Sequence, residues 1–202
     1  FLKTSHGSAA SGVVALERNG DRIQAHTAIE MAESSGAVRL YSTRRLRIYR
    51  DLGEVRRLVD ALCRERLHVE AWISKAGLAG RTADARVVVI GGRACHVILR
   101  LARGPITNLH LGAEKAGEHA LAEAAGTEAV ARVRALAEQA AACFPNSLYM
   151  GVDIALTPDF KKAFVLEVNA FGDLVEGVLW QGADTYTWEV RALLQRNWPP
   201  AR

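Results

Sequence analysis

The chain has 202 residues, of which 50% are hydrophobic and 24% charged, a composition that excludes a disordered, fibrous or disulfide-stapled protein. Charged residues interrupt every apolar run, so no segment reaches the roughly 18 to 20 apolar residues of a membrane span. Three widely spaced cysteines, Cys63, Cys95 and Cys143, lack metal-ligand spacing and are interpreted as buried thiols in a reducing cytoplasm. Arginine supplies 21 of the 26 basic residues behind the net charge of +4, which favours contacts to phosphate or carboxylate.

The first part of the chain carries strand and turn patterns followed by one helical pattern. Strands are expected at 1–3, 13–16, about 22–30 and about 37–49, with a loop of small residues at 4–12. After Asp51 the apolar residues Val55, Leu58 and Leu62 follow helical spacing, which predicts a helix over 53–66. A short apolar strand at 67–73 ends this part.

A glycine-bearing connector at 74–83 separates two lobes, which we place at 1–74 and 75–202. The second lobe is expected to hold strands at 86–91, 94–101, 149–156 and 163–169, with Gly91 and Gly92 forming the first hairpin turn. Residues 104–112 are expected to form a loop. Helices are expected from Thr127, as N-cap, to about 143 and from about 185 to 196 behind Asp184. The pattern predicts an α+β fold.

Polar residues alternate with apolar ones on the last two strands. Glu167 and Asn169 share one face, and Asp153 is expected to point outward, away from its apolar neighbours. Antiparallel pairing about a turn near Phe160 would place Asp153 opposite Glu167, with Cβ atoms roughly 4.5 to 5.5 Å apart. Carboxylates this close repel unless a cation lies between them, and oxygen ligands suit Mg²⁺ or Mn²⁺. Asp153, Glu167 and Asn169 therefore predict a divalent metal site; the alternative is the solvated face of an edge hairpin.

The loop between the first two strands has a composition that suits phosphate. Gly7, Ser8 and Gly12 would let the backbone approach a phosphate chain and aim N–H groups at it, and Lys3 adds a point charge. No helix with a Lys-Ser/Thr motif follows, so this is not a Walker loop. The alternative is an ordinary hairpin loop with a solvated lysine.

Taken in chain order, the motifs resemble those of ATP-grasp enzymes, and most closely the RimK-type amino-acid ligases. The matching segments are 3–12, 69–73, 84–87, 100 with 107–112, 151–154 and 166–170. The resemblance runs from Leu2 to about Gly177, and its specificity lies in the ordered series. It implies the ATP-grasp fold, in which two α+β lobes with antiparallel sheets clamp a nucleotide.

The resemblance also implies roles for particular residues. ATP, with Mg²⁺ or Mn²⁺, is the expected cofactor. Lys3, Gly7, Ser8 and Gly12 match phosphate-binding residues, and Glu70, Ala71, Trp72 and Ile73 match the adenine-binding hinge. The active-site residues of the family are matched by Arg86, Arg100 and Asn108, and its metal ligands by Asp153, Glu167 and Asn169.

The implied activity is a cytoplasmic carboxylate–amine ligase that forms an acyl phosphate from ATP, with small-molecule or peptide carboxylates and amines as substrates. The segment 170–174 departs from the Ser-Pro-Gly-Leu-like loop of the relatives, which leaves the substrate open, and the connector 78–82 is enlarged without an assigned role. A preceding N-terminal domain, usual in this family, is absent here, so we expect a fragment. A homo-oligomer is left open.

Three alternatives remain at this point. The chain could be an ATP-grasp phosphotransferase, a nucleotide-binding module without chemistry, or a basic nucleic-acid-binding domain. Intact metal-ligand positions argue against the second. Against the third, the arginines of 39–50 have no aromatic stacking platform beyond Tyr41 and Tyr49, so a solvated strand face is expected.

Overall fold

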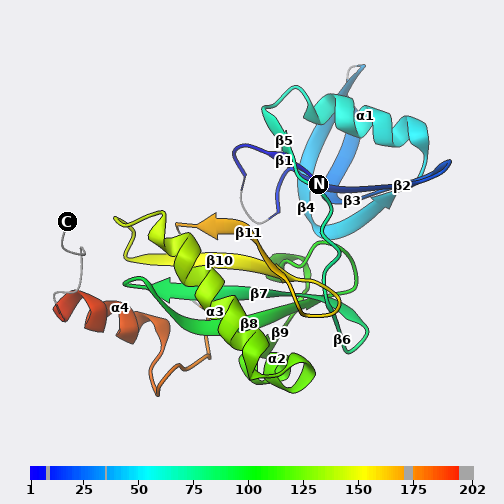
Figure 1. The fold of residues 1–202 in the computed structure, drawn as a ribbon. Coiled ribbons are helices and arrows are strands. Elements are labelled where there is room, and N and C mark those ends of the chain that lie inside the picture. The colour runs from blue at the N-terminus through cyan, green and yellow to red at the C-terminus, as the bar shows by residue number, and fades with distance from the viewer. Residues whose placement is uncertain (8–9, 35, 171–174, 196–202) are drawn as a thin grey trace. The chain divides into compact units, whose positions relative to one another are not determined.

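A computed structural model describes residues 1–7, 10–34, 36–170 and 175–195 (Figure 1). The chain is α+β and divides into two compact units, each built on an antiparallel sheet. The first unit comprises Phe1–Ile73 and Ala102–Ala113, and the second Ser74–Leu101 and Glu114–Arg202. The segment Ala102–Ala113 thus belongs to the first unit, whereas the sequence interpretation had placed it in the second. Within the described residues, every helix is too short or too polar to cross a membrane.

The first unit is a five-stranded sheet with one helix packed on it. The strand order is β4-β3-β2-β1-β5. The elements are β1 (Leu2–Thr4), β2 (Val13–Asn19), β3 (Arg22–Ser34), β4 (Ala37–Tyr49), α1 (Leu52–Leu62), β5 (Leu67–Val69) and the 3-10 helix η1 (Leu109–Leu111). The Asp51 side chain caps α1 by accepting a hydrogen bond from the Glu54 N–H at 2.9 Å. Val55, Leu58 and Leu62 are buried against the sheet, as their spacing predicts.

The strand expected at 67–73 ends early, at Val69. β5 pairs antiparallel with β1, with Leu2 opposite Val69, and the Glu70 N–H donates to the Phe1 carbonyl at 2.8 Å. Beyond this pair, residues 71–73 have no neighbouring strand among the described residues. Residues 70–73 therefore form an irregular segment.

The second unit is a six-stranded sheet ordered β11-β10-β7-β8-β9, with β6 paired to β7. Its strands are β6 (Gly77–Leu78), β7 (Arg81–Ile90), β8 (Arg93–Ala102), β9 (Glu114–Gly117), β10 (Tyr149–Leu156) and β11 (Ala163–Asn169). Its helices are α2 (Glu118–Ala125), α3 (Thr127–Ala142) and α4 (Thr185–Leu194). Gly91 and Gly92 both have positive φ in the β7–β8 turn, as the predicted hairpin requires.

One face of this sheet is buried under α3, which lies across the strands in Figure 1. The residues that pack there include Val87, Leu99, Val152 and Ile154 from the strands and Val133 from the helix. Because side chains alternate along a strand, the residues between these apolar positions point to the other face. That face carries the charged residues of the candidate site.

Two predictions of detail are wrong. Thr127 is the first residue of α3, and Gly126 is its N-cap. Cys63 and Cys143 are exposed, and of the three cysteines Cys95 alone is buried. Both exposed cysteines are C-cap residues, which lie just beyond the buried faces of α1 and α3.

Candidate functional site

The strand register brings the predicted acidic residues of the second unit together. Asp153 on β10 pairs with Glu167 on β11, as alternation predicted, and Gly151 pairs with Asn169. On its other side, Asp153 pairs with Arg86 of β7. Three adjacent strands therefore present these side chains on the face opposite α3.

Two arginines bind the Asp153 carboxylate. Arg86 donates from Nε to Oδ1 and from Nη2 to Oδ2, the latter at 3.1 Å. Arg100 donates from Nη1 to Oδ2 at 3.0 Å. Asp153 lies on the face away from its apolar neighbours, as expected, and it is only 5% exposed because the two guanidinium groups cover it.

The charged cluster extends to two residues that the sequence interpretation did not single out as site residues. Asp84 accepts from Arg100 Nε at Oδ1 and from Lys75 Nζ at Oδ2, both at 2.8 Å. Burial opposes ionisation of the Asp84 carboxyl, but the attraction of Arg100 and then of Lys75 outweighs it and lowers the pKa of Asp84. Burial likewise disfavours the charge on Arg100, and the attraction of Asp84 and Asp153 outweighs it and raises the pKa of Arg100.

The connector that had no assigned role explains how Lys75 reaches Asp84. β6 and β7 form a hairpin in which Gly77 pairs with Thr82, and the Ala83 N–H donates to the Ala76 carbonyl at 2.8 Å. Continuing this register places Lys75 directly opposite Asp84. Its turn, at residues 79–80, has positive φ at both positions, which suits a tight two-residue hairpin.

Gly151 gives Arg86 the room to lie over β10. A Cβ atom at position 151 would lie 3.2 Å from both Cδ and Nη1 of Arg86. Such a distance is tighter than ordinary van der Waals contact, so a larger residue would require the Arg86 side chain to shift by a few tenths of an ångström. The glycine of the Gly-Val-Asp-Ile segment therefore positions Arg86.

The predicted metal ligands have the right donor chemistry for a hard divalent cation. Glu167 is exposed and forms no ion pair with the described residues, and Asn169 has a buried Nδ2 without a hydrogen-bond partner in the described part of the chain. The third predicted ligand, Asp153, accepts hydrogen bonds from two arginines. Among residues 1–7, 10–34, 36–170 and 175–195 there is no group of three or more His, Cys, Asp or Glu placed to hold a metal. The two carboxylates and one amide oxygen fit a cation that also takes ligands from a bound phosphate and water.

In the first unit, the glycines of the loop after β1 pack closely around Thr4. Gly12 has φ of +72°, and a Cβ atom there would lie 2.3 Å from Thr4 Oγ1. A Cβ on Gly7 would lie 2.7 Å from the Ser11 carbonyl oxygen. Both glycines are thus required by the loop itself. Ser8, the remaining predicted phosphate-binding residue of the loop, lies outside the described residues.

Lys3 and the expected adenine-binding residues lie side by side in the first unit. Lys3 Nζ is 2.7 Å from Glu70 Oε2. Burial opposes the charge on Glu70, but its hydrogen bond and ion pair with Lys3 outweigh it and lower the pKa of Glu70. The Phe1 and Trp72 rings lie 5.1 Å apart, centroid to centroid. Ala71 is exposed and Ile73 is half-buried.

Asn108 has a local structural role in the structure. Its Oδ1 accepts a hydrogen bond from the His110 N–H at 2.8 Å and caps η1. It belongs to the first unit, whereas Arg86 and Arg100 belong to the second.

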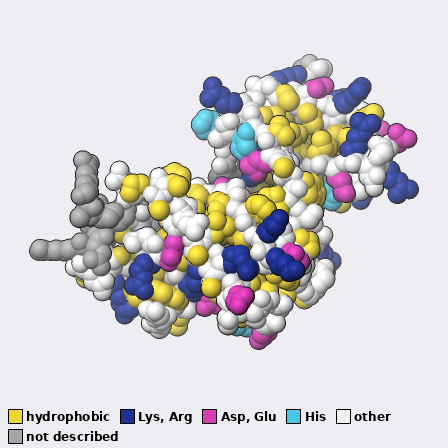
Figure 2. All heavy atoms as spheres, in the orientation of Figure 1, with side chains coloured by type: hydrophobic (Ala, Val, Ile, Leu, Met, Phe, Trp, Pro, Cys, Tyr) yellow, Lys and Arg dark blue, Asp and Glu magenta, His cyan; other side chains and the backbone are white. Residues whose placement is uncertain are grey.

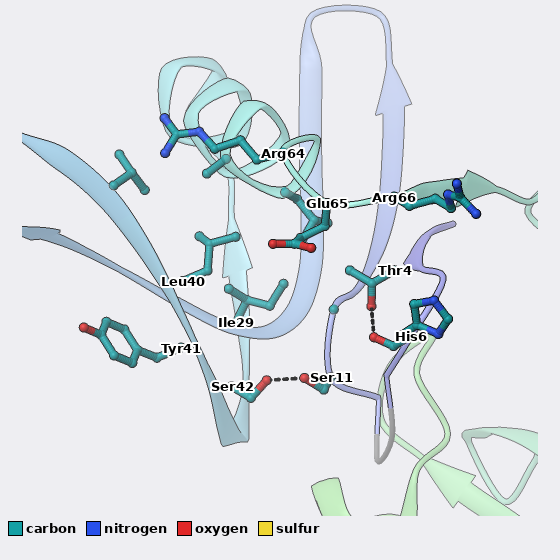
Figure 3. A pocket seen from close by; sticks show the side chains of 14 residues that line it. Thr4, His6, Ser11, Ile29, Leu40, Tyr41, Ser42, Arg64, Glu65 and Arg66 are labelled. Carbon is teal, nitrogen blue, oxygen red and sulfur yellow. Dashed lines mark hydrogen bonds between the residues drawn. The ribbon is translucent and has the colours of Figure 1, made fainter.

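A cavity of about 450 Å³ opens in the first unit beside the glycine loop (Figure 3). Ile29 and Leu40 point into it from the sheet, and Glu65 points into it from the segment after α1. At one side, the hydroxyls of Ser11 and Ser42 are 2.5 Å apart, which ties the loop to β4. The sequence carries no signal for this cavity, because its walls come from four distant segments.

Basic side chains of the first unit do not gather into one patch on the face drawn in Figure 2. There they are scattered among acidic and apolar side chains. Arg47 and Arg57, for example, are paired with Glu30 and Glu33.

Comparison with known proteins gives no assignment: no protein-family model matches the chain, and no curated protein is significantly similar to it.

Proposed function

We propose that the chain is an ATP-grasp enzyme of the RimK-like kind, a cytoplasmic ATP-dependent ligase that joins a carboxylate to an amine. One observation carries the proposal. Arg86 and Arg100 converge on Asp153, which pairs across the strands with Glu167, so the groups that we propose to bind phosphate and metal share one sheet face.

The charge of this cluster favours an anionic ligand. Three cations, Lys75, Arg86 and Arg100, surround two buried carboxylates, Asp84 and Asp153. Arginine's planar fork of N–H donors matches phosphate oxygens, so a nucleoside triphosphate suits this cluster.

The first unit has groups of its own that suit a nucleotide. Lys3 precedes the glycine loop and lies beside Glu70, and residues 71–73 offer backbone groups that no neighbouring strand of the described chain uses. In the proposal, the loop and Lys3 bind phosphates and the segment binds adenine.

The proposed reaction has two steps. An oxygen of the substrate carboxylate attacks the γ-phosphorus, the bond to the β-phosphate oxygen breaks, and ADP leaves an acyl phosphate behind. The neutral amine then attacks the acyl carbon, inorganic phosphate leaves, and the nitrogen releases one proton as the amide forms. Arg86 and Arg100 neutralise charge that develops on the transferring phosphoryl group. A divalent cation bound by Asp153, Glu167 and Asn169 would neutralise further charge on the phosphates.

Nucleotide binding is the first test. Calorimetry with Mg²⁺·ATP should show binding by the wild-type chain and at least tenfold weaker binding by Asp153→Asn and Glu167→Gln, since each removes a charge from the metal ligands. Arg81→Gln is the matched control, because Arg81 lies on the same strand as Arg86 but pairs with Glu114. Equal affinities in all four proteins would refute the site.

Product analysis is the second test. Amino acids and small carboxylates are screened for ADP release in the presence of Mg²⁺ and ATP. A ligase forms an amide and releases phosphate only when the amine is present. A stable phosphorylated product would instead identify a phosphotransferase.

A further inference from the structure

We propose that Arg86 is an exchangeable counter-ion. It forms an ion pair with Asp153 until a divalent cation binds this carboxylate, and it then binds a phosphate group of the nucleotide that arrives with the cation. Arg100 stays in place throughout, anchored on Asp84. The inference rests on the proposed function, and it adds an order of events at the same site.

Asp153 has little capacity left for a cation while both arginines hold it. A carboxylate offers about four lone-pair positions. Three N–H groups already occupy Asp153, two from Arg86 and one from Arg100. Mutual repulsion between a dication and two guanidinium groups in a buried site is also strong. A cation that binds Asp153 together with Glu167 therefore displaces at least one guanidinium.

The two arginines differ in what else holds them. Arg100 Nε donates to Asp84 at 2.8 Å, and Asp84 is itself held by Lys75. Arg86 has no hydrogen-bond or ion-pair partner other than Asp153 in the described part of the chain. When Asp153 binds a cation, Arg100 keeps its ion pair with Asp84, whereas Arg86 loses Asp153, its one partner among the described residues. Arg86 is therefore the group that leaves.

Arg86 also has a surface over which to move. Its guanidinium lies against Gly151, the next residue on the same face of β10, and Gly151 has no side chain to block it. Gly151 pairs with Asn169, which is one of the predicted metal ligands. Movement over Gly151 would take Arg86 off the Asp153 carboxylate while keeping it on the site face, where it can bind a phosphate oxygen.

Exchange predicts that cation and nucleotide bind with positive coupling. Either one alone must break the Arg86–Asp153 ion pair without satisfying both partners. Together they satisfy both, since the cation takes Asp153 and the phosphate takes Arg86. By thermodynamic linkage, each ligand then raises the affinity for the other by the same factor.

The decisive variant is Arg86→Gln, with Arg81→Gln as control. Mn²⁺ binding is measured by the electron paramagnetic resonance signal of the free ion, without nucleotide and then with ATP. Removal of the competing cation should tighten nucleotide-free Mn²⁺ binding by roughly tenfold or more. The same variant should bind Mn²⁺·ATP more weakly than wild type, and Arg81→Gln should match wild type in both measurements. A merely structural arginine would not produce this opposite pair of changes.

A second measurement needs no variant and so stands if Arg86→Gln does not fold. The Nε–H signals of the arginine side chains are followed by NMR while Mg²⁺ and then ATP are added to the wild-type protein. The Arg86 signal should shift and its hydrogen exchange should accelerate, because its Nε donates to Asp153. The Arg100 signal should stay, because its Nε donates to Asp84.

Failure of the exchange and failure of the proposed function give different results. If wild type binds Mn²⁺·ATP, but Mn²⁺ binding without nucleotide is no tighter in folded Arg86→Gln, or the Arg86 signal does not respond, the exchange is wrong and the proposed function stands. If wild type binds neither Mn²⁺ nor Mn²⁺·ATP, both are wrong.

Discussion

Asp84 illustrates how much one buried side chain can determine at this site. It is 1% exposed, and it holds Arg100 with one oxygen and Lys75 with the other. Asp84 itself is not proposed to contact the nucleotide or the metal ion. It acts through Arg100 and Lys75, so it is a positioning residue. Its carboxylate fixes the guanidinium of Arg100 at an angle that leaves Nη1 for Asp153.

Substitution Asp84→Asn should therefore be strongly destabilising. It removes the carboxylate charge that Lys75 and Arg100 share, and breaking a buried ion pair by removing one partner costs about 3 to 5 kcal/mol. Urea unfolding at pH 7 measures the loss. A change below 1 kcal/mol would mean that water, rather than Asp84, stabilises Lys75 and Arg100.

The pH dependence of stability gives a further prediction for the same residue. The pKa of Asp84 is below its ordinary value of 3.8 in the folded chain, so its contribution to stability is complete above pH 3.8 and is lost as the pH falls through the lower, folded-state pKa. The unfolding free energy of wild type should fall steadily in this acidic range. In a folded Asp84→Asn variant the slope should be shallower, and equal slopes would contradict the assignment.

Gly151→Ala should disturb Arg86 without touching any proposed ligand. The added methyl group would lie 3.2 Å from Cδ and Nη1 of Arg86, and overpacking of this kind costs about 1 to 3 kcal/mol. Nucleotide affinity should fall as well, because Arg86 no longer reaches its place. Gly77→Ala is the control: it is also a strand glycine of the second unit, but its nearest atom would be 3.8 Å away. Equal stability losses in the two variants would show that the Arg86 contact does not matter.

At the scale of elements, local patterns predicted the hairpins and missed what depends on distant partners. Alternation and turn residues correctly predicted Asp153 opposite Glu167 and the Gly91–Gly92 turn. β9 was missed because its Glu-Lys-Ala-Gly sequence has no strand preference of its own and forms a strand through pairing with the distant β8. The eight-residue α2 was missed because its Ala-rich sequence has a weak apolar face. The Lys75–Asp84 ion pair was not predicted either, because it depends on the pairing register of β6 and β7.

The glycine loop supplies a prediction at this scale. Gly12→Ala should destabilise the first unit whether or not nucleotide is present, because the new methyl group meets the Thr4 side chain and φ is +72°. Adding Thr4→Ala should restore part of the loss, since it removes the two closest atoms. A coupling free energy on the order of 1 kcal/mol is expected from the double-mutant cycle by urea unfolding. Additive effects would mean that the backbone strain alone makes Gly12 necessary.

For the whole molecule, the cysteines report on the folded state. Cys63 and Cys143 are exposed, whereas Cys95 is 1% exposed and burial raises the pKa of its thiol to about 11. At pH 8 only about a thousandth of Cys95 would be thiolate, the form that reacts. A disulfide reagent should therefore modify two thiols of the native chain rapidly and the third only on unfolding. Rapid modification of three thiols would contradict the burial of Cys95.

The two units should also differ in stability, because their cores differ in size. In the second unit, strands β7, β8 and β10 bury a continuous apolar face under α3, and β7 and β10 are flanked by strands on both sides. The core of the first unit is much smaller, formed where α1 packs on part of its sheet, and a cavity opens beside that core. Since buried apolar area sets the free energy of opening, amides of β2 and β3 should exchange through openings of lower free energy than amides of β7 and β10.

Hydrogen exchange followed by mass spectrometry tests this difference on the intact chain, and Cys95 provides an independent check. In increasing urea, peptides from β2 and β3 should lose protection first, while Cys95, which lies on β8, stays unreactive. If the β2–β3 peptides and Cys95 lose protection together at every urea concentration, the two units unfold as one cooperative body. Nucleotide would then stabilise the whole chain equally. With separate transitions, a ligand that binds Lys3 and the glycine loop should raise the protection of β2 and β3 most, because it raises the free energy of opening of the unit that it binds.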